Sequence, residues 1–241
     1  MERLIIEELL QWKTSPRRKP LILNGARQVG KTWILKHFGE IHYDNVAYIN
    51  CDKESLAAKL FEDYDVKRII QALEAMTNTQ IVAGKTLIII DEIQEVPRGL
   101  HALKYFAENA PEHHIAVAGS LLGLLLHQGE SFPVGKVNML QMYPMTFLEF
   151  LKAIGEDKMY QQLVNREWSV TNTVHEKIVK HLRMYLYVGG MPEAVQAYCD
   201  NAPLREIRSI HNEILTAYIN DLSKHAPKEQ VVRITQVFRS I

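Results

Sequence analysis

Short runs of consecutive apolar residues recur along the first part of the chain. Four of them lie at residues 21–23, 46–49, 87–90 and 115–118. A run that is apolar at every position, rather than at alternate positions, is typical of a strand buried on both faces of a parallel sheet. Apolar residues at helical spacing fill three other segments, at residues 4–12, 65–76 and 98–109. Strands that alternate with helices predict an open α/β layer, and residues 136–142 are predicted as its fifth strand.

Beyond Pro144 the pattern becomes helical throughout. Apolar residues at helical spacing fill four segments, at residues 147–151, 174–188, 192–198 and 204–222. Gly189 and Gly190, followed by Pro192, indicate a turn between two helices, and the same residues would also suit a hinge. We predict a first domain at residues 1–143 and an all-helical subdomain at residues 144–241. Because the last residues still follow a helical pattern without a cap, we expect that the chain is a fragment truncated at its C-terminus.

Composition excludes several classes of protein. Lys and Arg together number 28 and so do Asp and Glu, which argues against a polybasic nucleic-acid coat. The two cysteines, Cys51 and Cys199, are too few and too far apart for a disulfide scaffold and favour a reducing compartment. The longest uncharged apolar stretch, residues 115–126, is too short to cross a bilayer of about 30 Å. Acidic residues at the N-terminus argue against a signal peptide, so we expect a cytoplasmic protein without a membrane segment.

A glycine-rich loop follows the first predicted strand. It runs from Gly25 to Thr32 as GARQVGKT and matches the pattern G-x-x-x-x-G-K-[ST]. Glycines let consecutive N–H groups turn toward an anion, and a helix that begins near Lys31 directs its positive end at the same place. Lys31 would reach the β- and γ-phosphates, and Thr32 would ligate Mg²⁺. The alternative is a chance match. We expect ATP contacts from Gly25, Ala26, Arg27, Gln28, Val29, Gly30, Lys31, Thr32 and Trp33.

Two acids end the apolar run at residues 87–90. Asp91 and Glu92 would lie at the carboxyl edge of the sheet, where open α/β sheets bind ligands. We expect Asp91 to hold Mg²⁺, through water, and Glu92 to polarise the attacking water as a catalytic base. The alternative is that Asp91 caps a helix and Glu92 lies in its first turn.

Ser120 follows the predicted strand at residues 115–118. If that strand lies beside the strand of the phosphate loop, the hydroxyl of Ser120 would face the γ-phosphate and sense it or orient the water. Otherwise Ser120 would cap the apolar helix that follows it. Gln94 would also be within reach of the site, or it is a surface residue early in a helix. The predicted catalytic residues are Lys31, Glu92 and Ser120, and the predicted metal ligands are Thr32 and Asp91.

Five segments together resemble a known family. The segments are GARQVGKT, LIIIDEIQ, AVAGS, YPMTFLEFL and GGMPEAV. Their order and spacing, from about Pro20 to the end of the chain, are similar to those of bacterial and archaeal predicted AAA+ superfamily ATPases with a C-terminal domain of unknown function. The resemblance places Lys31 and Thr32 on Walker A, Asp91 and Glu92 on Walker B, and Ser120 on the first sensor position. It also implies a sheet whose middle strand carries the phosphate loop, flanked by the strands of the acids and the sensor.

The chain departs from the family at one position. Family members commonly have Gly-Arg before the fifth strand, whereas this chain has Gly135-Lys136, and a lysine lacks the planar fork of an arginine. No arginine can be assigned as an arginine finger from the sequence. The candidates are Arg27, Arg98 and Arg183.

The residues indicate a Mg²⁺-dependent P-loop ATPase that couples ATP hydrolysis to a conformational change, and the resemblance implies that it is of AAA+ type. The alternative is a nucleotide-gated switch or interaction module with little turnover. Glu92 favours the ATPase, and the lack of an assignable finger favours the switch. The basic stretch at residues 13–19 would suit DNA, although the zero net charge weighs against DNA as a partner. The resemblance allows an oligomer without requiring one.

Overall fold

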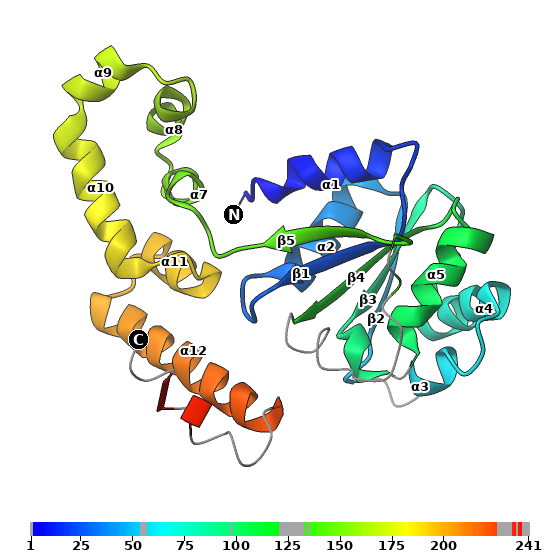
Figure 1. Ribbon diagram of the computed structural model, residues 1–241. Helices are drawn as coiled ribbons and strands as arrows, with labels where there is room; N and C mark the ends of the chain where they lie inside the picture. Colours follow the sequence, from blue (N-terminus) through cyan, green and yellow to red (C-terminus); the bar gives the residue numbers. More distant parts are fainter. Residues whose placement is uncertain are drawn as a thin grey trace. The chain divides into compact units, whose positions relative to one another are not determined.

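The computed structural model describes residues 2–53, 57–96, 98–120, 133, 135–225, 233–234 and 236–237. Contacts divide the chain into two compact units (Figure 1). The sheet unit comprises Ile5–Ala26 and Gly30–Met142, and the helical unit comprises Met1–Leu4, Arg27–Val29 and Tyr143–Ile241. The main division falls between Met142 and Tyr143, close to the predicted domain boundary. The assignment of two domains stays a prediction.

Five parallel strands form the sheet, as the sequence predicts. They are β1 (Leu21–Gly25), β2 (Asn45–Asn50), β3 (Thr86–Asp91), β4 (His114–Ser120) and β5 (Asn138–Met142). Their order is β2-β3-β4-β1-β5, and every neighbouring pair is parallel. The predicted α/β fold with a central, parallel five-stranded sheet is therefore confirmed.

The predicted neighbours of the phosphate-loop strand are wrong in part. β1 pairs with β4 and β5, and β3, which carries the acids, is separated from β1 by β4. The middle strand of the sheet is therefore β4. The apolar runs of β1, β3 and β4 are equally suited to a central position, so the pattern along the chain does not distinguish their order.

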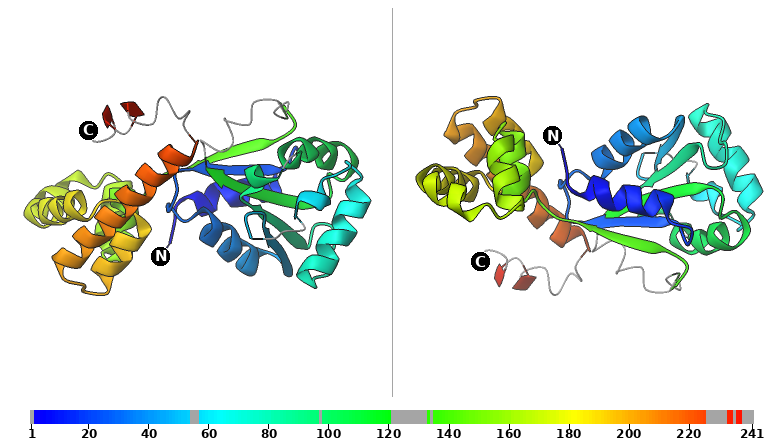
Figure 2. Two further views of the ribbon diagram at one scale, coloured as in Figure 1. Left: turned by 90° about the horizontal axis from the view of Figure 1, so that it is seen from below. Right: turned by 90° about the horizontal axis from the view of Figure 1, so that it is seen from above.

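Helices cover both faces of the sheet (Figure 2). They are α1 (Ile5–Thr14), α2 (Lys31–His42), α3 (Ala57–Leu60), α4 (Val66–Thr77), the 3₁₀-helix η1 (Ile93–Glu95) and α5 (Gly99–Asn109). The chain crosses from β1 to the far edge at β2 through α2 and returns strand by strand through α4 and α5. Because such crossovers are right-handed, α2 lies on one face and the α4–α5 pair on the other. Alternate strand residues face α4 and α5 in one core, among them Ile49, Ile88 and Ile90.

The helical unit has its own small core. Its helices are α7 (Phe147–Ala153), α8 (Asp157–Val164), α9 (Trp168–Thr173), α10 (His175–Val188), α11 (Pro192–Cys199) and α12 (Leu204–His225). Phe150, Val188 and Ile207 are fully buried in this core. Gly190 lies close to the segment that precedes α7, where an added Cβ would meet the carbonyl oxygen of Met145 at 2.2 Å. The last residues of the chain, 230–241, whose sequence follows a helical pattern, lie mostly outside the described residues.

None of the helices in the described part of the chain combines the length and the apolar character needed to span a lipid bilayer.

Candidate nucleotide-binding site

The loop after β1 turns in a way that its glycines permit. A Cβ added to Gly25 would lie 2.3 Å from the carbonyl oxygen of Met142 on β5, so no larger residue fits there. Gly30, at φ 94°, is the N-cap of α2 and is in the left-handed conformation that favours glycine. In the described structure α2 has no side-chain hydrogen bond at its N-cap. Its first N–H groups and its positive dipole end are therefore directed into the loop, which suits an anion.

Lys31 is held within this loop. Lys31 is 8% exposed, and its Nζ donates hydrogen bonds to the carbonyl oxygens of Gly25 at 2.9 Å and Ala26 at 2.7 Å. The ammonium group therefore lies at the start of the phosphate loop, the region in which the sequence predicts that Lys31 contacts the phosphates of ATP.

Thr32 and Asp91 meet although 59 residues separate them in the chain. The hydroxyl of Thr32 donates a hydrogen bond of 2.7 Å to Oδ2 of Asp91. Asp91 is the last residue of β3 and is 3% exposed. The alternative role of Asp91 as a helix cap does not hold, because its carboxylate accepts from hydroxyl groups and the N-cap of η1 is Glu92.

Glu92 has a strained backbone. Its φ of 51° and ψ of 43° are left-handed, which costs a non-glycine residue on the order of 1 kcal/mol and is common at functional sites. Its Oε2 accepts a hydrogen bond from Nε2 of Gln94, a residue that is 4% exposed. The structure thus pairs Gln94 with Glu92 and buries it, in contrast to the surface position that the sequence left open.

The backbone of Ser120 lies directly beside the phosphate loop. β4 pairs with β1 so that Ser120 is opposite Gly25, which meets the condition on which its predicted role depends. The side chain of Ser120 and the residues of the helix that it was expected to cap, 121–126, lie outside the described residues. Its function therefore stays a prediction.

Trp33 and Lys136 lie in surroundings that differ from those of the loop. Trp33 is 47% exposed, and its ring stacks on that of His37, with 4.7 Å between ring centroids. Lys136 precedes β5 and its Nζ lies 2.8 Å from a carboxylate oxygen of Glu108. Because β5 is parallel to β1, its first residue lies at the amino-terminal ends of the strands, whereas the phosphate loop lies at their carboxyl ends. Lys136 therefore forms an ion pair with Glu108 at the end of the sheet away from the phosphate loop.

The sequence analysis missed Arg3 and Glu149, which form a buried ion pair in the helical unit. Nε of Arg3 lies 2.9 Å from Oε1 of Glu149, and the two side chains are 6% and 5% exposed. The guanidinium also donates to the carbonyl oxygens of Val29 at 2.9 Å and Tyr143 at 2.7 Å. The pattern T-x-x-E, which places Glu149 three residues after the N-cap Thr146, is the one signal in the sequence for Glu149. Nothing comparable marks Arg3.

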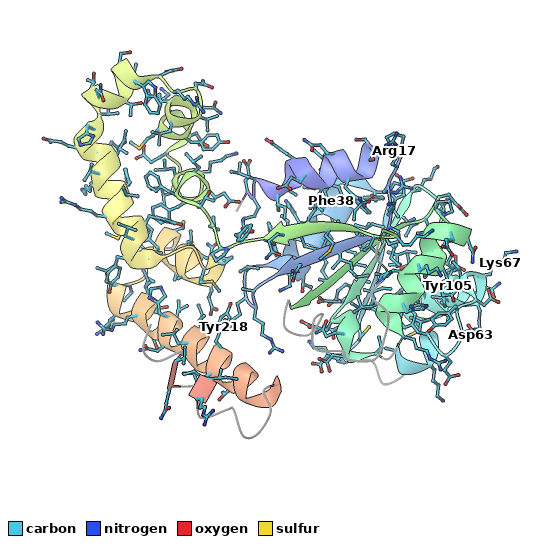
Figure 3. All side chains as sticks on the ribbon, viewed as in Figure 1. Arg17, Phe38, Asp63, Lys67, Tyr105 and Tyr218 are labelled. Atoms are coloured by element: carbon cyan, nitrogen blue, oxygen red, sulfur yellow. The ribbon has the colours of Figure 1, made fainter. Side chains whose placement is uncertain are left out.

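Tyr218 on α12 (Figure 3) was also missed. Its hydroxyl donates a hydrogen bond of 2.8 Å to the carbonyl oxygen of Arg27. Within the helical unit, Arg3 and Tyr218 therefore hold two carbonyl groups of the segment Arg27–Val29.

A family model described as an AAA domain matches residues 17–151, which is more than half of the chain. The chain belongs to this AAA domain family. The match spans the phosphate loop and the acids of β3, as the resemblance implied. A second model, described as a domain of unknown function (DUF8612), matches residues 179–241.

Individual proteins with similarity to the chain are only distantly related to it. The chain is 26% identical, over 245 aligned positions, to an uncharacterized protein of Haemophilus influenzae, covering 98% of this chain and 52% of that protein. The chain therefore spans about half the length of this curated relative. Solved structures with similarity include AMPPCP-bound DnaA from Aquifex aeolicus (14% identity, 91% of this chain, 67% of that one, TM-score 0.47). RuvB from Thermotoga maritima (13%, 98%, 70%, TM-score 0.44) and ORC1 from Aeropyrum pernix with DNA (13%, 92%, 66%, TM-score 0.42) are also similar.

Proposed function

We propose that this AAA domain binds ATP at the loop from Gly25 to Thr32 and hydrolyses it to ADP and phosphate in the presence of Mg²⁺. The observation that carries the proposal is the 2.7 Å hydrogen bond between Thr32 and Asp91. It joins the hydroxyl that would ligate the metal to the carboxylate that would hold a metal-bound water. The loop glycines, the uncapped start of α2 and Lys31 support the binding of a triphosphate at the same place.

The residues present fit Mg²⁺. A hydroxyl and a carboxylate are hard oxygen donors, which Mg²⁺ prefers, and few protein ligands suffice because the ion keeps several waters. Thr32 would ligate the ion directly and Asp91 would do so through water. When bound, Mg²⁺ would neutralise negative charge on the phosphate oxygens.

Glu92 is the proposed base for hydrolysis. Water attacks the γ-phosphorus, the new P–O bond forms as the bond to the bridging oxygen breaks, and ADP leaves. Glu92 takes the proton of the attacking water, and Ser120 is proposed to orient that water or sense the γ-phosphate. Glu92 would have to release the amide of Gln94 in order to accept this proton.

That same hydrogen bond favours a second candidate function, a nucleotide-gated switch. A base engaged by Gln94 gives slow turnover, and P-loop enzymes without an arginine finger lose about 10³–10⁵ in rate. In this case bound ATP would set a conformation and hydrolysis would be incidental.

Binding is tested by thermal melting with and without Mg·ATP. At a hundredfold excess over Kd, ATP should stabilise the chain by about 2.7 kcal/mol, which at this size raises Tm by roughly 5–11 °C. Lys31→Ala should abolish the shift. An unchanged shift in this variant would remove the site from the proposed place.

Turnover is tested by phosphate release. Glu92→Gln should bind ATP normally, and its rate of phosphate release should be lower by a factor of about 10²–10⁴. Glu95→Gln is the matched control, because Glu95 is an exposed acid three positions further along the chain. Equal rates for the two variants would exclude Glu92 as the base, and no release by the unmodified chain would favour the switch.

We also propose DNA as a partner, self-association of the chain and a cytoplasmic location. The same phosphate assay with added DNA tests the first, since a DNA-dependent motor would release phosphate faster. Sedimentation with and without ATP tests self-association. The cytoplasmic location is supported by Cys51 and Cys199, both of which are free thiols.

A further inference from the structure

Tyr48 lies beside the candidate metal site, on the face of the sheet that α2 covers. Its neighbours in β2, Ala47 and Ile49, point to the opposite face and belong to the core with α4 and α5. Because side chains alternate along a strand, Tyr48 and Asn50 point toward α2 instead. The sequence analysis treated Tyr48 as part of an apolar strand and gave it no function.

The hydroxyl of Tyr48 contacts the same oxygen as Thr32 does. It donates a hydrogen bond of 3.2 Å to Oδ2 of Asp91, and Thr32 donates one of 2.7 Å to that atom. Within the described residues, Oδ1 of Asp91 accepts no protein hydrogen bond. Two donors on one oxygen fix the rotation of the carboxylate and leave the other oxygen to face a ligand.

Tyr48 is itself held in place from two sides. Nζ of Lys36 lies 3.4 Å from the centroid of the phenol ring, and Nδ2 of Asn50 lies 3.5 Å from the hydroxyl. Thr32 and Lys36 are four residues apart on α2 and therefore lie on the same face of the helix. One turn of α2 thus contacts Asp91 directly through Thr32 and indirectly through Lys36 and Tyr48.

We propose that Tyr48 is a positioning residue for Mg²⁺, which orients Asp91 so that Oδ1 meets a metal-bound water. This proposal rests on the proposed ATP site. Residues that orient metal ligands in this way typically contribute 10–100-fold to metal affinity. The length of the Tyr48–Asp91 bond, 3.2 Å, favours the lower end of this range.

The test is a Mg²⁺ titration at fixed ATP, read by the melting shift and by phosphate release. Tyr48→Phe should raise the Mg²⁺ concentration at half-effect about 10-fold. At saturating Mg²⁺ the rate should return to within about twofold of the unmodified chain, and ATP affinity in the presence of EDTA should not change. Loss of fold alone would reduce the melting shift, the rate at saturating Mg²⁺ and the ATP affinity in EDTA together. A change confined to the Mg²⁺ requirement therefore identifies a positioning role.

Tyr43→Phe is the matched control, because Tyr43 also has a hydroxyl hydrogen bond, of 2.7 Å, but to His114. It should leave the Mg²⁺ requirement unchanged. Lys36→Met provides a second variant, which removes the cation from the ring of Tyr48. It should raise the Mg²⁺ requirement by about two- to fivefold, the factor that corresponds to the loss of an exposed cation–π contact. If Tyr48→Phe and Lys36→Met both match Tyr43→Phe while the unmodified chain responds to Mg·ATP, the positioning role is overturned and the ATP site stands. If the unmodified chain shows no response to ATP, both proposals fall.

Discussion

Replacing Arg3 with alanine tests whether the buried ion pair organises the helical unit. The change removes three hydrogen bonds, to Glu149, Val29 and Tyr143. It leaves Glu149, whose side chain is 5% exposed, as a buried anion without its cation. Breaking a buried ion pair by removing one partner costs about 3–5 kcal/mol, because the remaining charge is no longer compensated. Two backbone N–H groups, of Leu4 and Thr146, still donate to Glu149, so we expect a loss near the lower end.

The assay is urea unfolding followed by the far-ultraviolet helical signal, with Tm as a second measure. A loss of about 3 kcal/mol corresponds to a fall in Tm of roughly 6–12 °C at this size. Arg205→Ala is the control, because Arg205 is an exposed arginine of α12 in the same unit, and such surface changes usually stay within about 0.5 kcal/mol. A loss in Arg3→Ala no larger than that of Arg205→Ala would refute the reasoning.

Three other outcomes concern pH and the loop. Burial acts to raise the pKa of Glu149, but its hydrogen bonds outweigh burial and lower it. The part of the Arg3→Ala loss that is due to Glu149 should therefore be full above the ordinary carboxyl pKa and disappear as pH falls through the lowered pKa, which urea unfolding at a series of pH values would show. Burial and nearby cations lower the pKa of His114 to about 4. The free energy of unfolding should therefore fall as pH drops from about 6.5 toward 4, because the unfolded chain takes up the proton first. An NMR titration of this imidazole centred near 6.5 would contradict the prediction. Gly25→Ala should abolish the Mg·ATP melting shift, since its Cβ would meet Met142; an intact shift would contradict the close approach.

Local signals predicted the elements of the sheet unit well. The strands around residues 21–23 and 87–90 are marked by apolar runs that end at glycine or acids, and both features are read from adjacent residues. The order of the strands depends on which crossovers pack best, which the runs do not record. Helices α8 and α9 were also missed, because both are short and each has a single buried residue, Met159 and Thr171.

The candidate site divides in the same way. Thr32 and Asp91 belong to contiguous patterns, so the sequence predicted that they would meet, and they do. Arg3 acts through partners at positions 29, 143 and 149, and no local pattern connects these positions. Tyr48 was missed because an aromatic residue within an apolar run indicates core. Its hydroxyl, on the same face of β2 as Asn50, is the signal that would have pointed to the site.

Isothermal titration calorimetry with ATP tests the central claim most directly, namely that the loop from Gly25 to Thr32 binds a nucleotide triphosphate. In the presence of Mg²⁺, the unmodified chain should give a saturable heat with one site per chain, and Lys31→Ala should give none. No heat from the unmodified chain, or the same heat from both chains, would contradict the account.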